Sequence, residues 1–500
     1  MSHTQKFTNR WGIILASLGM AIGAGNLWRF PRLAGQYGGT FILLWILFLF
    51  VWSIPLLLSE FAIGKYFKEG VISSFGRFTG KKFVWMGFFI TVCTLGIAFY
   101  YSVVTAWSFQ YFILSVKNLY LSLFDGKEFL KTLESQPDFL QHHWQSISNA
   151  NLVTIIIFFV VILAGVSILV KGIKEGLERL NRILIPCLFI LLILIIFVSL
   201  SIKGGILGLE YMFTFRIEYL QEPKVWVEAL SQSAWSTGAG WGLMMTISSY
   251  SSDQEDVTLN TFIGAFGNNV ASLIAGMAIL PAVFALAATE TDAIHYLEQG
   301  NQALTFNVIP DLFARIPAGN FMAVIFFMTL LLAAFTSFLP MIELFIGNLV
   351  SFGIERGKTL YIVVFSFLLF GFPSAYSLDF FSNQDWVWGI GLILSGFFLL
   401  FAVVKHGPHR FKSKLIDKDA DLYINKWYFS VCIHLNLFVA LFLIYWWMSQ
   451  GYSQYPWFDE DRQWNIFDVY SNATIVTQWF VVILVGLLLN NFLYKRLVKK

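Results

Sequence analysis

Two short segments of the sequence combine glycines with groups that can bind ions. The first is MAIGAGNLWRFP at residues 20–31, which interrupts an apolar run with Gly23 and Gly25 and then supplies Asn26. The second is WSTGAGWG at residues 235–242, again inside an apolar run. Lipid cannot satisfy unpaired backbone groups, so an unwound segment inside a membrane must face protein or a cavity. There its carbonyl oxygens can ligate a cation, and its N–H groups can hold an anion.

The composition places most of the chain in lipid. Of 500 residues, 57% are hydrophobic and only 13% are charged, whereas a soluble domain carries roughly 25% charged residues. A net charge of +3 gives no indication of a nucleic-acid partner. The three cysteines lie singly inside apolar segments, which predicts core packing rather than a disulfide framework or a metal site.

Twelve apolar segments approach the length of about 20 residues that crosses a bilayer. They occupy roughly residues 11–34, 41–64, 83–116, 151–170, 181–202, 226–250, 257–288, 320–350, 359–375, 385–404, 427–449 and 474–494. An even number of spans puts both termini on one side of the membrane. The loops on that side carry the basic clusters, at 65–82, 171–182, 405–418 and 495–500. Because cytoplasmic loops are enriched in Lys and Arg, both termini are predicted to be cytoplasmic.

The two Gly-rich interruptions fall in the first and sixth spans. A spacing of five spans predicts an all-α integral membrane protein with a five-plus-five inverted repeat, in which helices one and six are unwound mid-membrane. Paired interruptions of this kind indicate a transporter's binding site, although glycines also permit close helix packing. The predicted organisation is a cytoplasmic N-tail (1–10), a first repeat (11–202), an extracellular loop (203–225), a second repeat (226–404), a cytoplasmic loop (405–426), and two further spans with a cytoplasmic C-tail (427–500).

Several motifs together resemble the neurotransmitter:sodium symporter family, whose structural type is the LeuT fold. They are GAGNLWRFP (23–31), KGIKEGLERLNRILIP (171–186), QSAWSTGAGWG (232–242), LLAAFTS (331–337) and DWVWG (385–389), in that family's order. The resemblance covers the first ten spans. It implies a sodium-coupled symporter that imports an amino acid by alternating access, here in a bacterial inner membrane.

The resemblance implies two sodium sites built from oxygen atoms. One comprises the carbonyl oxygens of Gly19, Ile22 and Ala333 with the hydroxyls of Thr336 and Ser337. The other comprises the Ala21 carbonyl, the Asn26 amide oxygen, Ser236 and one Asn of the GNN sequence at 267–269, which alignment on Gly276 assigns to Asn268. In the family the substrate carboxylate completes this second shell. Judged from the residues alone, the alternative is that the hydroxyls of Thr336 and Ser337 donate to carbonyl oxygens of their own helix.

The resemblance also suggests the class of substrate. Amine transporters of the family carry an Asp three residues before the signature Asn, where this chain has Gly23. A glycine leaves space for the carboxylate of an amino acid, which we expect at the N–H groups of Ala24 and Gly25 and at the Tyr101 hydroxyl. Because burying an unpaired charge is costly, a wall without charged side chains predicts a neutral, apolar amino acid. The other residues of this predicted pocket are Met20, Ala21, Ile97, Trp235, Ser236, Gly238, Trp241, Ser337 and Met341.

Gates are expected at both ends of the pathway. Arg29 is predicted to pair with Asp385 as the outer gate, with Trp235 and Tyr101 as a thin lid over the substrate. At the inner end the family's latch is absent: Thr4 stands where the family has an Arg, and Lys6 with Glu355 is a possible substitute.

Chloride dependence is open at this stage. The family's chloride ligands correspond to Gln232, Ser236 and Ser272, but Trp45 replaces a Tyr of that shell and removes its hydroxyl. Two other classes of function compete with a symporter. An amino-acid sensor on the same fold is expected to carry an additional soluble domain, and the short tails leave no room for one. A membrane enzyme requires a cluster of catalytic residues, which the scattered histidines do not provide. The expected partners are the substrate and the bilayer, and the oligomeric state is not predicted.

Overall fold

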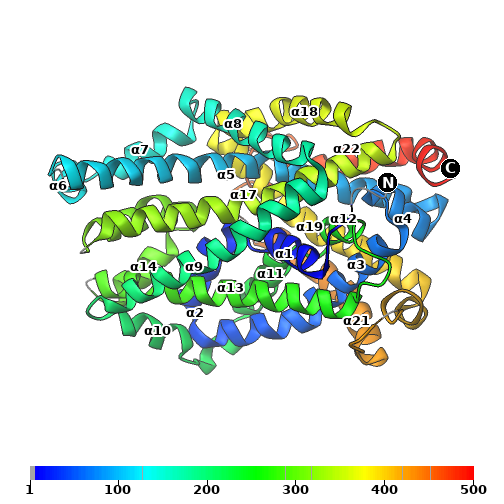
Figure 1. Ribbon diagram of the computed structural model, residues 1–500, viewed down its shortest axis with the longest axis horizontal. Helices are drawn as coiled ribbons and strands as arrows, with labels where there is room; N and C mark the ends of the chain where they lie inside the picture. The colour runs from blue at the N-terminus through cyan, green and yellow to red at the C-terminus, as the bar shows by residue number, and fades with distance from the viewer. Residues whose placement is uncertain are drawn as a thin grey trace.

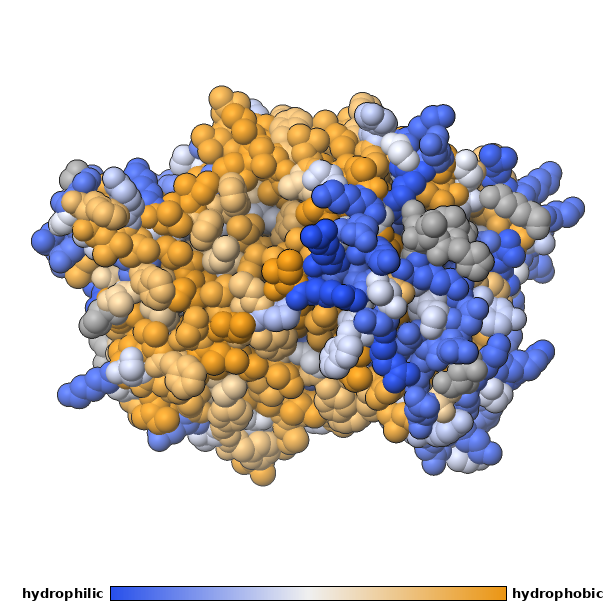
Figure 2. All heavy atoms as spheres, viewed as in Figure 1, coloured by the Kyte–Doolittle hydropathy of each residue, from blue (hydrophilic) through white to orange (hydrophobic). Residues whose placement is uncertain are grey.

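The computed structural model describes residues 6–126, 128–287, 289–316, 318–418, 420–450 and 452–499. Within these ranges the chain is built from helices, and its β-structure is limited to an isolated bridge between Phe458 and Trp464. The helices run mostly along one direction, and both termini lie at the same end of the molecule (Figure 1). Apolar side chains cover the broad middle of the visible face, and polar ones gather mainly at the end that holds the termini (Figure 2). This distribution fits a bundle that crosses a membrane.

The first and sixth predicted spans are broken, as the sequence indicates. The first consists of α1 (Arg10–Ala21) and the start of α2 (Ala24–Phe48), and the sixth of α11 (Pro223–Thr237) and α12 (Leu243–Ser248). α1 packs against α12, and α2 packs against α11, so the two interrupted spans lie side by side. The remaining spans are continuous, and ten helical segments of the described residues are long and apolar enough to cross a bilayer.

The other elements surround this pair. The long helices are α3 (Ile54–Phe67), α5 (Val84–Phe124), α8 (Leu152–Val170), α9 (Arg179–Ser201), α13 (Val257–Leu286), α17 (Gly319–Ser351), α18 (Arg356–Tyr376), α19 (Leu378–His406), α21 (Lys426–Ser449) and α22 (Asn472–Leu493). Shorter helices are α4 (Val71–Thr79), α6 (Phe129–Ser135), α7 (Phe139–Ser148), α10 (Gly205–Phe213), α14 (Glu290–Glu298), α15 (Asn301–Ala303), α16 (Ile309–Ala314) and α20 (Pro408–Phe411). Turns of π-helix occur at Leu49–Ser53, Ile173–Glu178, Leu304–Val308, Lys412–Ile416 and Tyr494–Val498, and 3-10 turns at Lys81–Phe83 and Ile217–Gln221.

The first two predicted spans are joined without the loop expected between residues 34 and 41. Instead, the turn is confined to Gly38, whose φ of +62° and ψ of −150° are not helical and which separates two helices within α2. Glycine accepts this left-handed conformation without the steric penalty of a side chain. At Gly39, a Cβ atom would lie 2.6 Å from the carbonyl oxygen of Phe213, so α10 approaches the backbone directly. The turn is therefore made by a single glycine between two helices and by the close packing of α10.

Candidate functional site

The first break frees backbone groups at the centre of the bundle. Ile22 and Gly23 leave the helix, with ψ of 91° at Ile22 and φ of −113° at Gly23, before α2 starts at Ala24. The Asn26 side-chain oxygen accepts a hydrogen bond from the Gly23 N–H at 3.1 Å and caps the new helix. The break therefore presents carbonyl oxygens from the end of α1 and N–H groups from the start of α2.

The second break depends on three glycines and one buried acid. Gly238, Gly240 and Gly242 have φ values of +69°, +91° and +75°, a region that other residues rarely adopt. The Glu60 carboxylate, on α3, accepts hydrogen bonds from the N–H groups of four residues of this segment, at 2.8 to 3.3 Å (Gly240, Gly242, Met244 and Met245). Glu60 thus replaces the helical bonds that the unwound segment has lost.

Oxygen atoms from α1 and α17 converge beside the first break. The Ser337 hydroxyl lies 3.0 Å from the carbonyl oxygens of both Gly19 and Ile22 and donates to them. The Thr336 hydroxyl donates to Leu332 at 2.9 Å and lies 3.2 Å from the Ala333 carbonyl oxygen. Ser337 therefore reaches across to α1, whereas Thr336 bonds back to its own helix. Because one hydroxyl proton is shared by two carbonyls, a cation would satisfy these oxygens better.

A second set of oxygens lies on the other side of Asn26. The Asn26 amide nitrogen donates to the Asn268 side-chain oxygen at 2.8 Å, and the Asn268 nitrogen donates to the Ser236 hydroxyl at 3.1 Å. The Asn268 oxygen also lies 3.1 Å from the Ala21 carbonyl oxygen and 3.0 Å from that of Ser236. Rotated by half a turn, the amide would donate to both carbonyls instead. The Asn268 amide therefore lies where the Ala21 and Ser236 carbonyl oxygens converge, next to Asn26.

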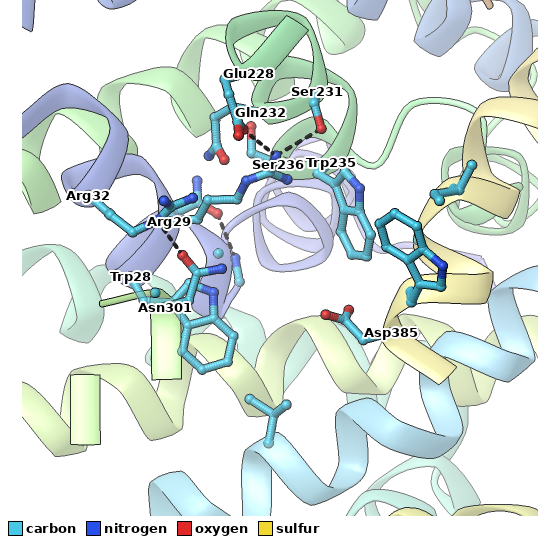
Figure 3. A pocket seen from close by; sticks show the side chains of 18 of the residues that line it. Trp28, Arg29, Arg32, Glu228, Ser231, Gln232, Trp235, Ser236, Asn301 and Asp385 are labelled. Atoms are coloured by element: carbon cyan, nitrogen blue, oxygen red, sulfur yellow. Dashed lines mark hydrogen bonds and ion pairs between the residues drawn. The ribbon is translucent and has the colours of Figure 1, made fainter. Parts of the chain in front are cut away.

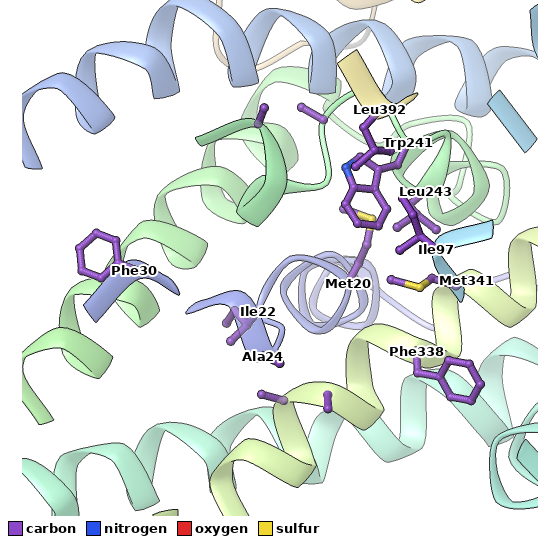
Figure 4. Packing of buried hydrophobic residues seen from close by; sticks show 14 of the residues in the cluster. Met20, Ile22, Ala24, Phe30, Ile97, Trp241, Leu243, Phe338, Met341 and Leu392 are labelled. Carbon is purple, nitrogen blue, oxygen red and sulfur yellow. The ribbon is translucent and has the colours of Figure 1, made fainter. Parts of the chain in front are cut away.

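A cavity of about 800 Å³ connects both breaks to the molecular surface. All the residues predicted to bind substrate line it, except Ala24 and Ile97. Its inner part is apolar, where Met20, Trp241 and Met341 lie close together and Ile97 packs beside them (Figure 4). Its outer rim includes Tyr452, in a loop at the end opposite the termini, so the cavity opens on that side.

The polar corner of the cavity lies where α2 begins. The Ala24 N–H donates to the Tyr101 hydroxyl oxygen at 3.0 Å, which leaves the hydroxyl proton free to donate. A Cβ atom at Gly23 would lie 2.9 Å from the Tyr101 oxygen and 3.0 Å from the Ser337 oxygen. At Gly25, by contrast, nothing lies within 4 Å of that position. The corner therefore combines hydrogen-bond donors with open space, which suits a carboxylate.

The outer pair differs from the expected one. The Arg29 guanidinium forms an ion pair with Glu228 at 3.0 Å and donates to the Ser231 hydroxyl at 2.9 Å. Asp385 lines the same cavity but lies apart from this cluster (Figure 3). The predicted Arg29–Asp385 contact is thus replaced by a nearer acid on α11. Glu228 could have been identified from the sequence, because an acid within a membrane span needs a partner.

At the end that holds the termini, three residues form a cluster that sequence reasoning missed. The Glu343 carboxylate is fully buried and accepts from the Tyr250 hydroxyl at 2.5 Å and from Arg356 at 2.9 and 2.6 Å. We call this cluster the inner latch. It joins the segment after α12 to α17 and α18. Glu355, the predicted partner of Lys6, lies 3.9 Å from Lys358 instead, and Thr4 is outside the described residues.

The chain's N-terminal segment is also held at this end. The buried Glu178 carboxylate accepts hydrogen bonds from the Thr8 N–H at 2.9 Å and from the Arg182 guanidinium at 2.5 Å, and so ties this segment to the start of α9.

Of the predicted chloride ligands, Gln232 and Ser236 lie on α11, and Ser272 accepts from Asn26 beside the first break at 2.8 Å. Both side-chain amide atoms of Gln232 and the Trp45 indole nitrogen are buried and make no hydrogen bond to any described residue.

Comparison with known proteins agrees with this geometry. The model of the Sodium:neurotransmitter symporter family matches residues 4–123 and 127–491. An uncharacterized sodium-dependent transporter of Methanocaldococcus jannaschii is 30% identical over 369 residues, which cover 73% of this chain and 74% of the relative. The sodium-dependent neutral amino acid transporter B(0)AT2 of Pongo abelii is 30% identical over 289 residues, 52% of this chain and 38% of the relative.

A solved structure shares the fold over most of the chain. The crystal structure of MhsT in complex with L-phenylalanine superimposes with a TM-score of 0.73 at 25% identity, covering 88% of this chain and 98% of MhsT. These matches confirm the predicted LeuT fold with its broken first and sixth spans, and the class they indicate is a sodium-dependent transporter rather than an enzyme. The chain belongs to the sodium:neurotransmitter symporter family.

Proposed function

We propose that the protein is a sodium-coupled symporter that imports a neutral, apolar amino acid by alternating access. The observation that carries the proposal is the cavity at the two breaks, which joins two oxygen clusters, a donor-lined polar corner and an apolar wall. Sodium is a hard cation that prefers oxygen ligands, and unwound backbone in transporters of this fold coordinates it.

Two sodium ions are proposed, one at each cluster. The first would be held by Gly19, Ile22, Ala333, Thr336 and Ser337, after the Thr336 hydroxyl turns from its own helix toward the ion. The second would be held by the set around Asn268 (Ala21, Asn26, Ser236 and Asn268). The convergence of the Ala21 and Ser236 carbonyl oxygens on the Asn268 amide supports the second ion, because a hard cation prefers oxygen ligands.

The substrate is proposed to bind with its carboxylate in the polar corner and its side chain against the apolar wall. The carboxylate would accept hydrogen bonds from the Tyr101 hydroxyl and from the start of α2, whose helix dipole favours an anion. The charged side chains of the cavity, such as Arg29 and Glu228, lie toward its outer rim rather than at this wall. The neutral amino acid transporter among the relatives and the phenylalanine bound to MhsT support this substrate class.

Coupling follows if the carboxylate is also a ligand of the ion at Asn268. Asn26 connects the two, since it caps the break beside Gly23 and bonds to Asn268. A shared ligand means that each species raises the other's affinity by the same factor. Sodium should therefore increase amino-acid affinity, and the amino acid should increase sodium affinity.

The conformation supports alternating access with cytoplasmic termini. The cavity opens at the end opposite the termini, while the inner latch holds the other end closed. The basic loops lie on the side of the termini, which favours a bacterial inner membrane with this end in the cytoplasm. In this scheme, residues 11–202 and 226–404 are the two repeats, and they move against each other around the fixed site.

Chloride is a second candidate ligand. The unpaired amide of Gln232 and the indole N–H of Trp45 are buried donors, and the hydroxyls of Ser236 and Ser272 contact Asn268 and Asn26. Buried donors without partners are costly, and an anion would satisfy them. Replacing chloride by gluconate in a binding assay tests this: we expect weaker amino-acid binding, and unchanged binding would exclude chloride as a required ligand.

Binding by the purified full-length protein tests the main proposal. We expect radiolabelled apolar amino acids, leucine and phenylalanine among them, to bind in sodium and not in potassium at equal ionic strength. The double variant Thr336→Ala/Ser337→Ala should lose sodium-dependent binding while remaining folded by thermal unfolding. Binding that is equally strong in potassium would refute the coupling, and unchanged sodium dependence of the double variant would refute the first sodium site.

A further inference from the structure

The Asn181 side-chain amide, on α9, is buried but belongs to neither oxygen cluster nor the cavity described above. Asn181 is 0% exposed, and neither its oxygen nor its nitrogen has a hydrogen-bond partner among the described residues. An unpaired polar group in a protein interior loses its bonds to water without compensation. Such groups are uncommon enough in folded proteins that each one calls for a reason, and an ion is among the usual reasons.

The amide rests directly on the backbone of the first break. A Cβ atom at Gly19 would lie 2.9 Å from the Asn181 nitrogen and 3.2 Å from its oxygen, so only glycine fits between the two helices. The Gly19 carbonyl is one of the two that the Ser337 hydroxyl reaches. The unpaired amide therefore packs against the residue whose carbonyl oxygen belongs to the cluster, and a glycine at position 19 leaves the space for it.

Asn181 approaches the cluster from the side that faces the termini. It is the third residue of α9 and lies three residues after Glu178, which binds the N-terminal segment through Thr8. Glu178 itself would contact a Cβ atom at Gly12, so the start of α9 faces two successive glycines of α1. The start of α9 therefore lies along α1 between the Gly19–Ser337 cluster and the N-terminal segment.

We propose that the Asn181 side-chain oxygen is a further ligand of the cation held by Gly19, Ile22 and Ser337, on the side through which the cation leaves toward the termini. This inference rests on the proposed sodium binding. An amide oxygen suits a hard cation, and a half-turn about the last side-chain bond exchanges its oxygen and nitrogen. The arrangement explains both the missing partners of the amide and its position against Gly19.

The competing explanation is packing alone, with or without a trapped water. In that case Asn181→Leu, which has a similar volume, should leave sodium binding unchanged, because replacing an unpaired polar group by an apolar one is neutral or stabilising. If the amide ligates the cation, the same substitution should weaken sodium binding. Asn181→Asp should strengthen it, because a carboxylate keeps an oxygen in place and adds a negative charge.

The test measures ²²Na⁺ binding to the purified full-length protein without amino acid. We expect Asn181→Leu to bind sodium about fivefold more weakly, the value for one lost polar interaction, and Asn181→Asp to bind it more tightly. The matched control is Ser199→Ala on the same helix, which removes a buried hydrogen bond to Ala278 remote from the cluster and should leave sodium affinity unchanged.

Three results would overturn the proposal: unchanged affinity in Asn181→Leu, unchanged or weaker affinity in Asn181→Asp, or an equal loss in Ser199→Ala. A shared cation also requires that Asn181→Leu have a smaller effect in a Ser337→Ala background than alone, since residues on one ligand are not additive. Failure of the proposed function is distinct, because then the wild-type protein itself would show no saturable sodium binding.

Discussion

The inner latch should control how often the end that holds the termini opens. Arg356→Ala removes the only cation that the described residues place on the buried Glu343 carboxylate, and it leaves the Tyr250 hydroxyl as a single donor. Breaking a buried ion pair by removing one partner costs about 3–5 kcal/mol. In an open conformation water reaches the carboxylate, so most of this cost applies to the closed state alone. The equilibrium should therefore shift toward the open state by roughly 100- to 4,000-fold.

Cysteine labelling at a buried position measures this shift. Ser17 on α1 is 1% exposed and lies between the N-terminal segment and the Gly19 cluster, so Ser17→Cys reports opening at this end. The native cysteines at 93, 187 and 432 would first be replaced by alanine. In purified protein, the rate of alkylation by a water-soluble reagent should rise by at least about 100-fold in Arg356→Ala.

Two further variants make the result specific to the latch. Lys358→Ala disrupts an ion pair in which both side chains are about three-quarters exposed, and exposed pairs contribute little, so its labelling rate should match the parent. The double variant Glu343→Leu/Arg356→Leu leaves no unpaired charge and should label more slowly than Arg356→Ala. An Arg356→Ala protein that labels at the parental rate would refute the role assigned to the latch.

Three other substitutions test the site. Glu60→Gln places an NH₂ group against two of the N–H donors of the second break. We expect a loss of roughly 2–6 kcal/mol from these two unpaired donors, seen as a much lower melting temperature, and an unchanged melting temperature would contradict this. Ser337→Ala should raise the sodium concentration needed for half-maximal amino-acid binding, and an unchanged requirement would count against it. Glu228→Gln should free Arg29 to pair with Asp385 and close the outer gate. Bound amino acid should then dissociate more slowly, and faster dissociation would argue that Glu228 itself closes the site.

Much of the fold was predictable because lipid imposes strong rules. Each predicted span corresponds to helices in the structure, since apolar runs of this length have few alternatives in a bilayer. The break at 22–23 and the one around Gly238–Gly242 were also predictable, because glycines and polar groups interrupt otherwise continuous apolar runs. The tightness of the turn between the first two spans was not, because a turn confined to Gly38 depends on the close approach of α10.

Ion-pair partners were the least predictable part of the site. Sequence identifies Arg29 as a charge in need of a partner, but two acids compete for it, and the choice depends on a few ångströms in the arrangement of α11 and α19. Glu343 and Arg356 are separated by the end of α17 and a short turn, and nothing in the local pattern indicates that they meet. Asn181 was hidden for a similar reason, because its missing partners are visible only when its neighbours are placed.

Uptake into liposomes tests the central claim most directly. The purified protein is reconstituted, and entry of a radiolabelled apolar amino acid is followed with an inward sodium gradient, with equal sodium on both sides, or with potassium in place of sodium. The account predicts accumulation above equilibrium only with the gradient, and no concentrative uptake in potassium. Equal accumulation in sodium and potassium would contradict it.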